Sequence, residues 1–122
     1  MTLWSVGSAV SQAYTLAQGA AYSEPFRKDP VTGGIAIKIT KDPNGLYNGS
    51  PQTIFAYSLD GATIWYDLSD TFGDAFAGNK LSVSSTNTAC PAIVWASGTP
   101  PAGSQVKACD SAHDVTLTLC AP

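Results

Sequence analysis

Two runs rich in β-branched and aromatic residues flank the pair Asp60-Gly61. An Asp-Gly pair supplies the positive φ angles of a tight turn, so these runs are predicted to form a β-hairpin. Two sets of side chains alternate in the second run: the apolar Ile64, Tyr66 and Leu68, and the set Trp65, Asp67 and Ser69. Because successive side chains of a strand point to opposite faces, Trp65 and Asp67 should share the face opposite the apolar set.

Other stretches of the chain also predict short strands. Residues 35–40 and 115–119 alternate between apolar and smaller or polar positions, which is typical of half-buried strands. Shorter strands are predicted for residues 2–6, 21–26, 80–84 and 92–96, and residues 8–19 could form one helical turn or a strand and a turn. Turn signals recur about every ten residues, which predicts an all-β fold, an antiparallel β-sandwich or a barrel.

Length and composition narrow the class of protein. A chain of 122 residues fits one domain, 1–122, and 44% hydrophobic with 12% charged residues excludes a disordered chain. The few Lys and Arg residues are scattered, so nucleic acid is an unexpected partner. No apolar run approaches the roughly 20 residues of a membrane span. The composition is typical of a secreted β-module, although no signal peptide precedes Met1, which we interpret as a start residue added to a mature sequence.

The carboxylates of the hairpin and the following loop are the candidate catalytic groups. Two acids flanking a cleft can hydrolyse a glycosidic bond, one as proton donor and one as nucleophile or base. The candidates are Asp67 with Asp70 or Asp74. The alternative is structural: Asp60 in the turn, Asp70 capping a turn and Asp74 solvated.

Other chemistry has little support in the sequence. His113 lies between Asp110 and Asp114 but has no second nitrogen or sulfur partner, so we expect a surface loop residue, no metal ion and no cofactor. No G-x-S-x-G motif or phosphate-binding glycine loop is present. Exposed aromatic rings could instead stack on sugars or contact a protein, and Trp65 is the ring that we expect to be exposed.

Three cysteines and one glycosylation motif bear on a secreted protein. Cys90, Cys109 and Cys120 fit neither a CxxC motif nor a zinc site, and their odd number leaves one thiol without an internal partner. A Cys90–Cys109 bridge would contribute about 3 kcal/mol, and three reduced thiols are the alternative. Asn48-Gly49-Ser50 matches the N-glycosylation motif, with Pro51 directly after it.

Long stretches of the chain resemble one protein family. They are Leu3–Ser8 (LWSVGS), Tyr22–Phe26 (YSEPF), Asp29–Ile39 (DPVTGGIAIKI), the hairpin, Pro100–Lys107 (PPAGSQVK) and Asp114–Cys120 (DVTLTLC). On these the chain resembles the fungal antigenic thaumatin-like proteins, which include the Blastomyces yeast-phase-specific protein. The resemblance implies a thaumatin-like β-sandwich in a small form, without the disulfide-rich second domain of plant thaumatins.

The same resemblance indicates an incomplete acidic cleft. Family members with glucan-hydrolysing activity carry a carboxylate on the first hairpin strand, and that position is Ala56 here. Asp67 and Asp70 or Asp74 match other cleft acids, and Lys38 falls near the cleft arginine. An enzyme that lacks one of two acids should be slow or inactive, which favours binding over hydrolysis. The expected ligand-binding residues are Trp65, Asp60, Lys38 and Tyr57.

The resemblance also implies a missing N-terminal strand. In the family an upstream strand carries a cysteine that pairs with the closing strand, so Cys120 would be the free thiol and Cys90–Cys109 the intact disulfide. One sheet would expose an edge near the N-terminus, which predicts a homodimer through that edge or through Cys120.

We therefore expect a secreted fungal protein of the cell surface or cell wall. The leading hypothesis is non-catalytic binding of β-glucan or of a cell-wall or host protein, with roles in spore germination, wall organisation or host contact implied by the resemblance. The alternatives are a weak endo-β-1,3-glucanase and a secreted effector recognised by a host protein.

Overall fold

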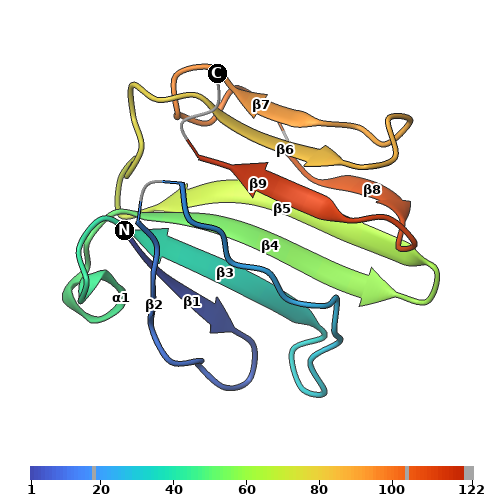
Figure 1. The fold of residues 1–122 in the computed structure, drawn as a ribbon, viewed down its shortest axis with the longest axis horizontal. Helices are drawn as coiled ribbons and strands as arrows, with labels where there is room; N and C mark the ends of the chain where they lie inside the picture. Colours follow the sequence, from blue (N-terminus) through green and yellow to red (C-terminus); the bar gives the residue numbers. More distant parts are fainter. Residues whose placement is uncertain (18, 104, 120–122) are drawn as a thin grey trace.

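Two antiparallel sheets form the protein in a computed structural model, which describes residues 1–17, 19–103 and 105–119 (Figure 1). The larger sheet has the order β2-β1-β3-β4-β5-β8, and the smaller has the order β7-β6-β9. The strands are β1 (Thr2–Val6), β2 (Tyr14–Thr15), β3 (Gly34–Thr40), β4 (Gln52–Asp60), β5 (Thr63–Thr71), β6 (Leu81–Ser85), β7 (Ile93–Trp95), β8 (Lys107–Asp110) and β9 (Val115–Thr118). This all-β arrangement of two antiparallel sheets confirms the predicted β-sandwich class.

The hairpin β4–β5 is the centre of the larger sheet. Its register runs from Gln52 opposite Thr71 to Asp60 opposite Thr63, and Gly61 in the turn has a φ of 58°. This is the positive φ that the Asp-Gly pair predicted. Along β5, Ile64, Tyr66 and Leu68 are buried, whereas Trp65 is exposed and Asp67 is half-buried, so the predicted alternation is confirmed.

The core lies between the inner face of the larger sheet and two covers. One cover is the smaller sheet, which contributes Leu81, Val83, Ile93 and Trp95 to the same buried cluster as Ile64, Tyr66 and Leu68. The other is the segment between β2 and β3, which crosses the face of β3 and β4 in Figure 1. Its Phe26 ring packs 5.3 Å from the ring of Tyr57 on β4.

One predicted strand is absent, and one observed strand was not predicted. Residues 21–26 form no strand, because their backbone crosses the sheet and is held there by side-chain contacts of Tyr22, Glu24 and Phe26. Strand β8, in contrast, was not predicted from the sequence. It adds to β5 through the pairing of Thr63 with Asp110 and of Tyr66 with Lys107.

At the N-terminal side, the larger sheet ends in β2 rather than in β1. Residues 10–16 pair along the outer side of β1: Val6 bridges Val10, Leu3 pairs with Tyr14, and the Leu16 amide donates to the Met1 carbonyl. Residues 8–19 thus contain the short strand β2 rather than a helical turn. The single helix of the described residues, α1 (Gly45–Asn48), has four residues, and none there is long and apolar enough to cross a membrane.

Candidate functional site

The outer face of the larger sheet, opposite the core, carries a band of small side chains between two walls. Across the strands, Val6 lies opposite Ala36, Ala36 opposite Ala56, and Ala56 opposite Asp67. The neighbouring row joins Gly34, Ser58 and Trp65. Because β3 and β4 present only small residues in these two rows, the surface is lower there than at Val6 and Trp65.

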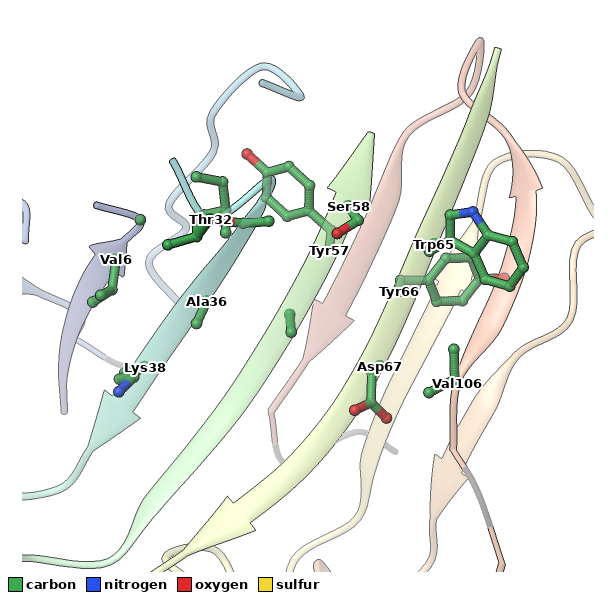
Figure 2. A pocket seen from close by; sticks show the side chains of 14 residues that line it. Val6, Thr32, Ala36, Lys38, Tyr57, Ser58, Trp65, Tyr66, Asp67 and Val106 are labelled. Carbon is green, nitrogen blue, oxygen red and sulfur yellow. Dashed lines mark hydrogen bonds between the residues drawn. The ribbon is translucent and has the colours of Figure 1, made fainter. Parts of the chain in front are cut away.

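This band is the floor of an open hollow of about 440 Å³, which we call the outer-face hollow. Figure 2 shows it crossed by β3, β4 and β5, with Lys38 on one side and Trp65 on the other. The residues that line it are Val6, Gly7, Thr32, Gly34, Ile35, Ala36, Lys38, Ala56, Tyr57, Ser58, Trp65, Tyr66, Asp67 and Val106.

Two opposite charges face this hollow without a hydrogen-bond or ion-pair partner among the described residues. Lys38 and Asp67 are both half-buried, and they lie on strands separated by β4 (Figure 2). Within residues 1–17, 19–103 and 105–119, neither side chain has a hydrogen bond or ion pair to another described residue. Both groups can therefore donate to or accept from a ligand without breaking an existing contact.

Trp65 supplies the apolar wall of the hollow. Its side chain is 45% exposed, although most large apolar residues of β4 and β5 are buried. It stands between Ser58 on β4 and Ala108 on β8, two small neighbours that leave the indole uncovered. An exposed indole beside polar groups can stack on the apolar face of a sugar ring or contact a protein.

The structure separates the other predicted site residues from the outer-face hollow. Asp60 is exposed at the far end of the hairpin, and Asp70 points to the opposite face, where the Thr53 hydroxyl donates to its Oδ1 at 3.0 Å. Asp74 lies beyond β5, in a different hollow of about 200 Å³. Of the three candidate catalytic acids, only Asp67 lines the outer-face hollow.

Tyr57 belongs to the core side of the sheet. It contributes to the lining of the hollow, but it is only 5% exposed and its hydroxyl donates to Glu24 Oε2 at 2.5 Å. Its partner across the strands is the buried Tyr66. The Tyr57 ring is therefore not on the exposed surface that carries Trp65.

Glu24 collects three hydroxyl donors where residues 21–26 cross the sheet. Ser5, Tyr22 and Tyr57 donate to its carboxylate, and Arg27 lies 3.3 Å from Oε2. Burial alone would raise the pKa of Glu24, but the hydroxyl donors and the Arg27 charge lower the pKa below its ordinary value. Burial and the neighbouring Glu24 carboxylate raise the pKa of Tyr22 to about 12.

Asp29 shapes the end wall of the hollow. Its carboxylate accepts hydrogen bonds from the Ser8 amide and hydroxyl and from the Val31 and Thr32 amides, at 2.7–2.9 Å. These bonds, led by those from the Ser8 and Thr32 amides, hold the pKa of Asp29 well below its usual range. Both Thr32 and Gly7 line the hollow, so Asp29 positions part of it. No sequence pattern links Asp29 to Ser8, so this contact could not be predicted from the sequence.

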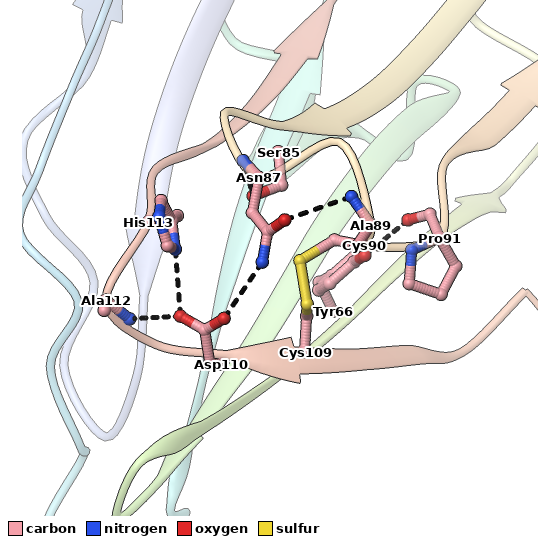
Figure 3. The surroundings of a disulfide bond; sticks show 10 residues. All are labelled: Tyr66, Ser85, Asn87, Ala89, Cys90, Pro91, Cys109, Asp110, Ala112 and His113. Carbon is pink, nitrogen blue, oxygen red and sulfur yellow. Dashed lines mark hydrogen bonds and ion pairs between the residues drawn. A yellow bond between two sulfur atoms is a disulfide. The ribbon is translucent and has the colours of Figure 1, made fainter.

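The predicted disulfide between Cys90 and Cys109 is confirmed (Figure 3). It joins the β6–β7 connection to β8 and so links the two sheets. Beside it, Asp110 accepts hydrogen bonds from Asn87 and from the Ala112 amide, and lies 3.0 Å from His113 Nδ1. Cys120 lies outside the described residues.

Asn48 of the glycosylation motif is exposed. Its side-chain oxygen accepts hydrogen bonds from the amide and hydroxyl of Ser50. Whether it carries a glycan stays a prediction of the sequence.

Comparisons with known proteins give a consistent result. Residues 1–121 match the model of the family described as Blastomyces yeast-phase-specific protein. The chain is 30% identical, over 129 aligned positions, to the antigenic thaumatin-like protein of Arthroderma benhamiae. The alignment covers 98% of this chain and 64% of that protein, so the chain spans less than two thirds of this relative's length. It is 29% identical to the secreted thaumatin-like protein calA of Emericella nidulans, covering 96% of this chain and 72% of the relative.

The fold has a solved counterpart. It is similar to the crystal structure of the protein elicitor MoHrip2 from Magnaporthe oryzae, with a TM-score of 0.78 and 26% sequence identity. The match covers 98% of this chain and 90% of that one.

Proposed function

Since the chain belongs to the Blastomyces yeast-phase-specific protein family, we propose that it is a secreted thaumatin-like protein that binds β-glucan without hydrolysing it. The relatives matched are named secreted or antigenic thaumatin-like proteins of fungi, which supports an extracellular or cell-wall location. The proposed binding site is the outer-face hollow.

The observation that carries the proposal is the pairing of one wall tryptophan with two unpartnered charges. Trp65 offers a flat apolar surface, while Asp67 can accept hydrogen bonds from sugar hydroxyls and Lys38 can donate to them. The low floor at Ala36 and Ala56 leaves room for a sugar chain between these groups.

The arrangement of acids supports binding over hydrolysis. Glycoside hydrolysis needs two carboxyl groups on either side of one bond, about 5–9.5 Å apart. Asp67 faces the hollow alone among the described carboxylates, because Ala56 stands opposite it and Asp70 points to the other face.

The test combines retention and hydrolysis. Purified protein is incubated with insoluble β-1,3-glucan and with laminarin, and both the retained protein and the released reducing sugar are measured. We expect retention without release, with retention weakened about tenfold by Trp65→Ala or Asp67→Ala, equal to ~1.4 kcal/mol. Asp60→Asn, on the same hairpin but outside the hollow, and Val94→Ala, an exposed residue of the smaller sheet, are the matched controls.

The other outcomes identify the competing functions. Sugar release that disappears in Asp67→Ala would replace this proposal with a weak endo-β-1,3-glucanase. If the protein is not retained and no sugar is released, glucan binding is contradicted. The second candidate would then be recognition by a cell-wall or host protein, which the likeness to a protein elicitor favours.

A further inference from the structure

The end of β5 places a carboxyl group against a buried hydroxyl. Asp70 lies opposite Thr53 in the register of β4 and β5, and Thr53 is fully buried. The Thr53 hydroxyl donates to Asp70 Oδ1 at 3.0 Å. The other oxygen, Asp70 Oδ2, is shielded from water and has no donor among the described residues.

Asp74 is the neighbouring acidic side chain that interacts with the Asp70 carboxyl group. Its carboxyl lies within hydrogen-bonding reach of Asp70, but a carboxylate cannot donate. A hydrogen bond between the two groups therefore requires that one of them carries a proton. Two ionised carboxylates in contact repel each other, and such a pair takes up one proton more readily than an isolated acid.

The surroundings favour Asp70 as the protonated member. Asp70 is packed against β4, whereas Asp74 is exposed and shares a hollow of about 200 Å³ with Lys41 and Asp42. The Lys41 ammonium, which lies 5.6 Å from the Phe76 ring centroid, places positive charge on the Asp74 side. Burial first, and then the Asp74 carboxyl, raise the pKa of Asp70 to about 7.

The backbone between the two acids is strained. Phe72 has a φ of 62°, a left-handed conformation that a bulky residue rarely adopts, and its side chain is 68% exposed. Such a conformation persists only where surrounding contacts hold it. Directly after it, the Asp74 carbonyl accepts the Ala77 amide, and Phe76 enters the core. The contact between Asp70 and Asp74 spans the strained residue.

We propose that Asp70 and Asp74 share one proton and form a pH-sensitive latch that holds residues 71–74 against the end of β4. When the proton is lost, the two carboxylates separate and the strained turn opens, while both sheets stay folded. The latch is independent of glucan binding, because neither acid lines the outer-face hollow.

The test follows the carboxyl groups and the turn in the same full-length chain. Carboxyl ¹³C chemical shifts are recorded from about pH 4 to about pH 9, together with amide hydrogen exchange corrected for its intrinsic pH dependence. We expect Asp70 to titrate near neutral pH. Exchange of amides 71–77 should rise about tenfold across the same interval, while amides of β3 stay protected.

Variants separate the latch from a general pH effect. In Asp70→Asn the amide donates to Asp74 without a titrating proton, so the turn should stay closed at every pH. Asp74→Asn, at an exposed position, serves the same purpose if Asp70→Asn does not fold. Asp60→Asn should leave both the titration and the opening unchanged. Titration of Asp70 near pH 4, or turn exchange that is the same in the wild type and in both latch variants, would overturn the proposal.

Discussion

Ala56 lies directly opposite Asp67 across strands β4 and β5, on the outer face of the larger sheet. The methyl group of Ala56 leaves space beside the Asp67 carboxylate, and that space is part of the outer-face hollow. The pairing therefore determines both the shape of the hollow and the number of acids that face it.

Ala56→Glu should weaken glucan binding. The new side chain would fill the floor of the hollow and place a second negative charge beside the Asp67 carboxylate, which would repel it. We expect affinity to fall about tenfold, equal to ~1.4 kcal/mol, as measured by affinity electrophoresis in laminarin gels. Ala56→Ser, which is small, should migrate like the wild type, and unchanged migration of Ala56→Glu would place the ligand elsewhere.

Glu24→Gln should destabilise the fold. The amide of glutamine keeps one acceptor oxygen, so the hydroxyls of Ser5, Tyr22 and Tyr57 would compete for it. We expect a loss of about 1.5–3 kcal/mol in the free energy of unfolding, measured by guanidinium denaturation. Asp60→Asn changes an exposed carboxylate that has no side-chain hydrogen bond or ion pair among the described residues, so it should lose almost nothing. Equal midpoints for the two variants would contradict a role of Glu24 in holding residues 21–26.

The Asp29 carboxylate should make stability depend on pH in the acidic range. Its folded-state pKa lies well below the unfolded value of about 3.9, so its contribution is fully present above that value and is lost as pH falls. Asp29→Asn, whose amide cannot accept all four hydrogen bonds, should melt at a lower temperature than the wild type at neutral pH. The difference should shrink below about pH 4 in thermal melts, and a difference constant with pH would show that the charge is unimportant.

Gly7→Ala tests the same region by packing. A Cβ atom at Gly7 would lie 2.4 Å from Asp29 Oδ1 and 3.1 Å from Ile35 Cδ1, so the Asp29 loop would have to move. We expect a loss of about 1–3 kcal/mol in unfolding free energy and weaker glucan retention, because Gly7 lines the hollow. The control is Ala9→Ser, which changes an exposed residue nearby and should be neutral. Gly33→Ser would not serve, because Gly33 has a φ of 77°, where a side chain is strained.

Removal of the disulfide should lower stability without changing the hairpin. The double variant Cys90→Ser/Cys109→Ser removes the cross-link between the β6–β7 connection and β8. The two cysteines are 19 residues apart in the sequence. We expect the free energy of unfolding, measured by guanidinium denaturation, to fall by about 3 kcal/mol. The wild type should lose the same amount under reducing conditions. A wild type insensitive to reductant would mean that the bond contributes little.

A homodimer through Cys120 stays a prediction, which non-reducing gels and size-exclusion chromatography can check.

Local sequence patterns determined the hairpin, the face shared by Trp65 and Asp67, and the sandwich class. The Asp60-Gly61 turn and the two-residue period act over neighbouring positions, so they can be followed in the sequence alone. The family resemblance, confirmed by the match over residues 1–121, added the Cys90–Cys109 pairing.

Only the tertiary structure decided which groups meet. Asp67 and Asp70 are three residues apart on β5, so the alternation of strand side chains places them on opposite faces of the sheet. The residues that they face, Ala56 and Thr53, come from the neighbouring strand β4. The contacts of Glu24 with Tyr57 and of Asp29 with Ser8 join positions 33 and 21 residues apart. Such contacts depend on how the chain crosses the sheet, and no periodicity encodes that path. For the same reason residues 21–26, which contain strand-forming side chains, became a crossing segment instead of a strand.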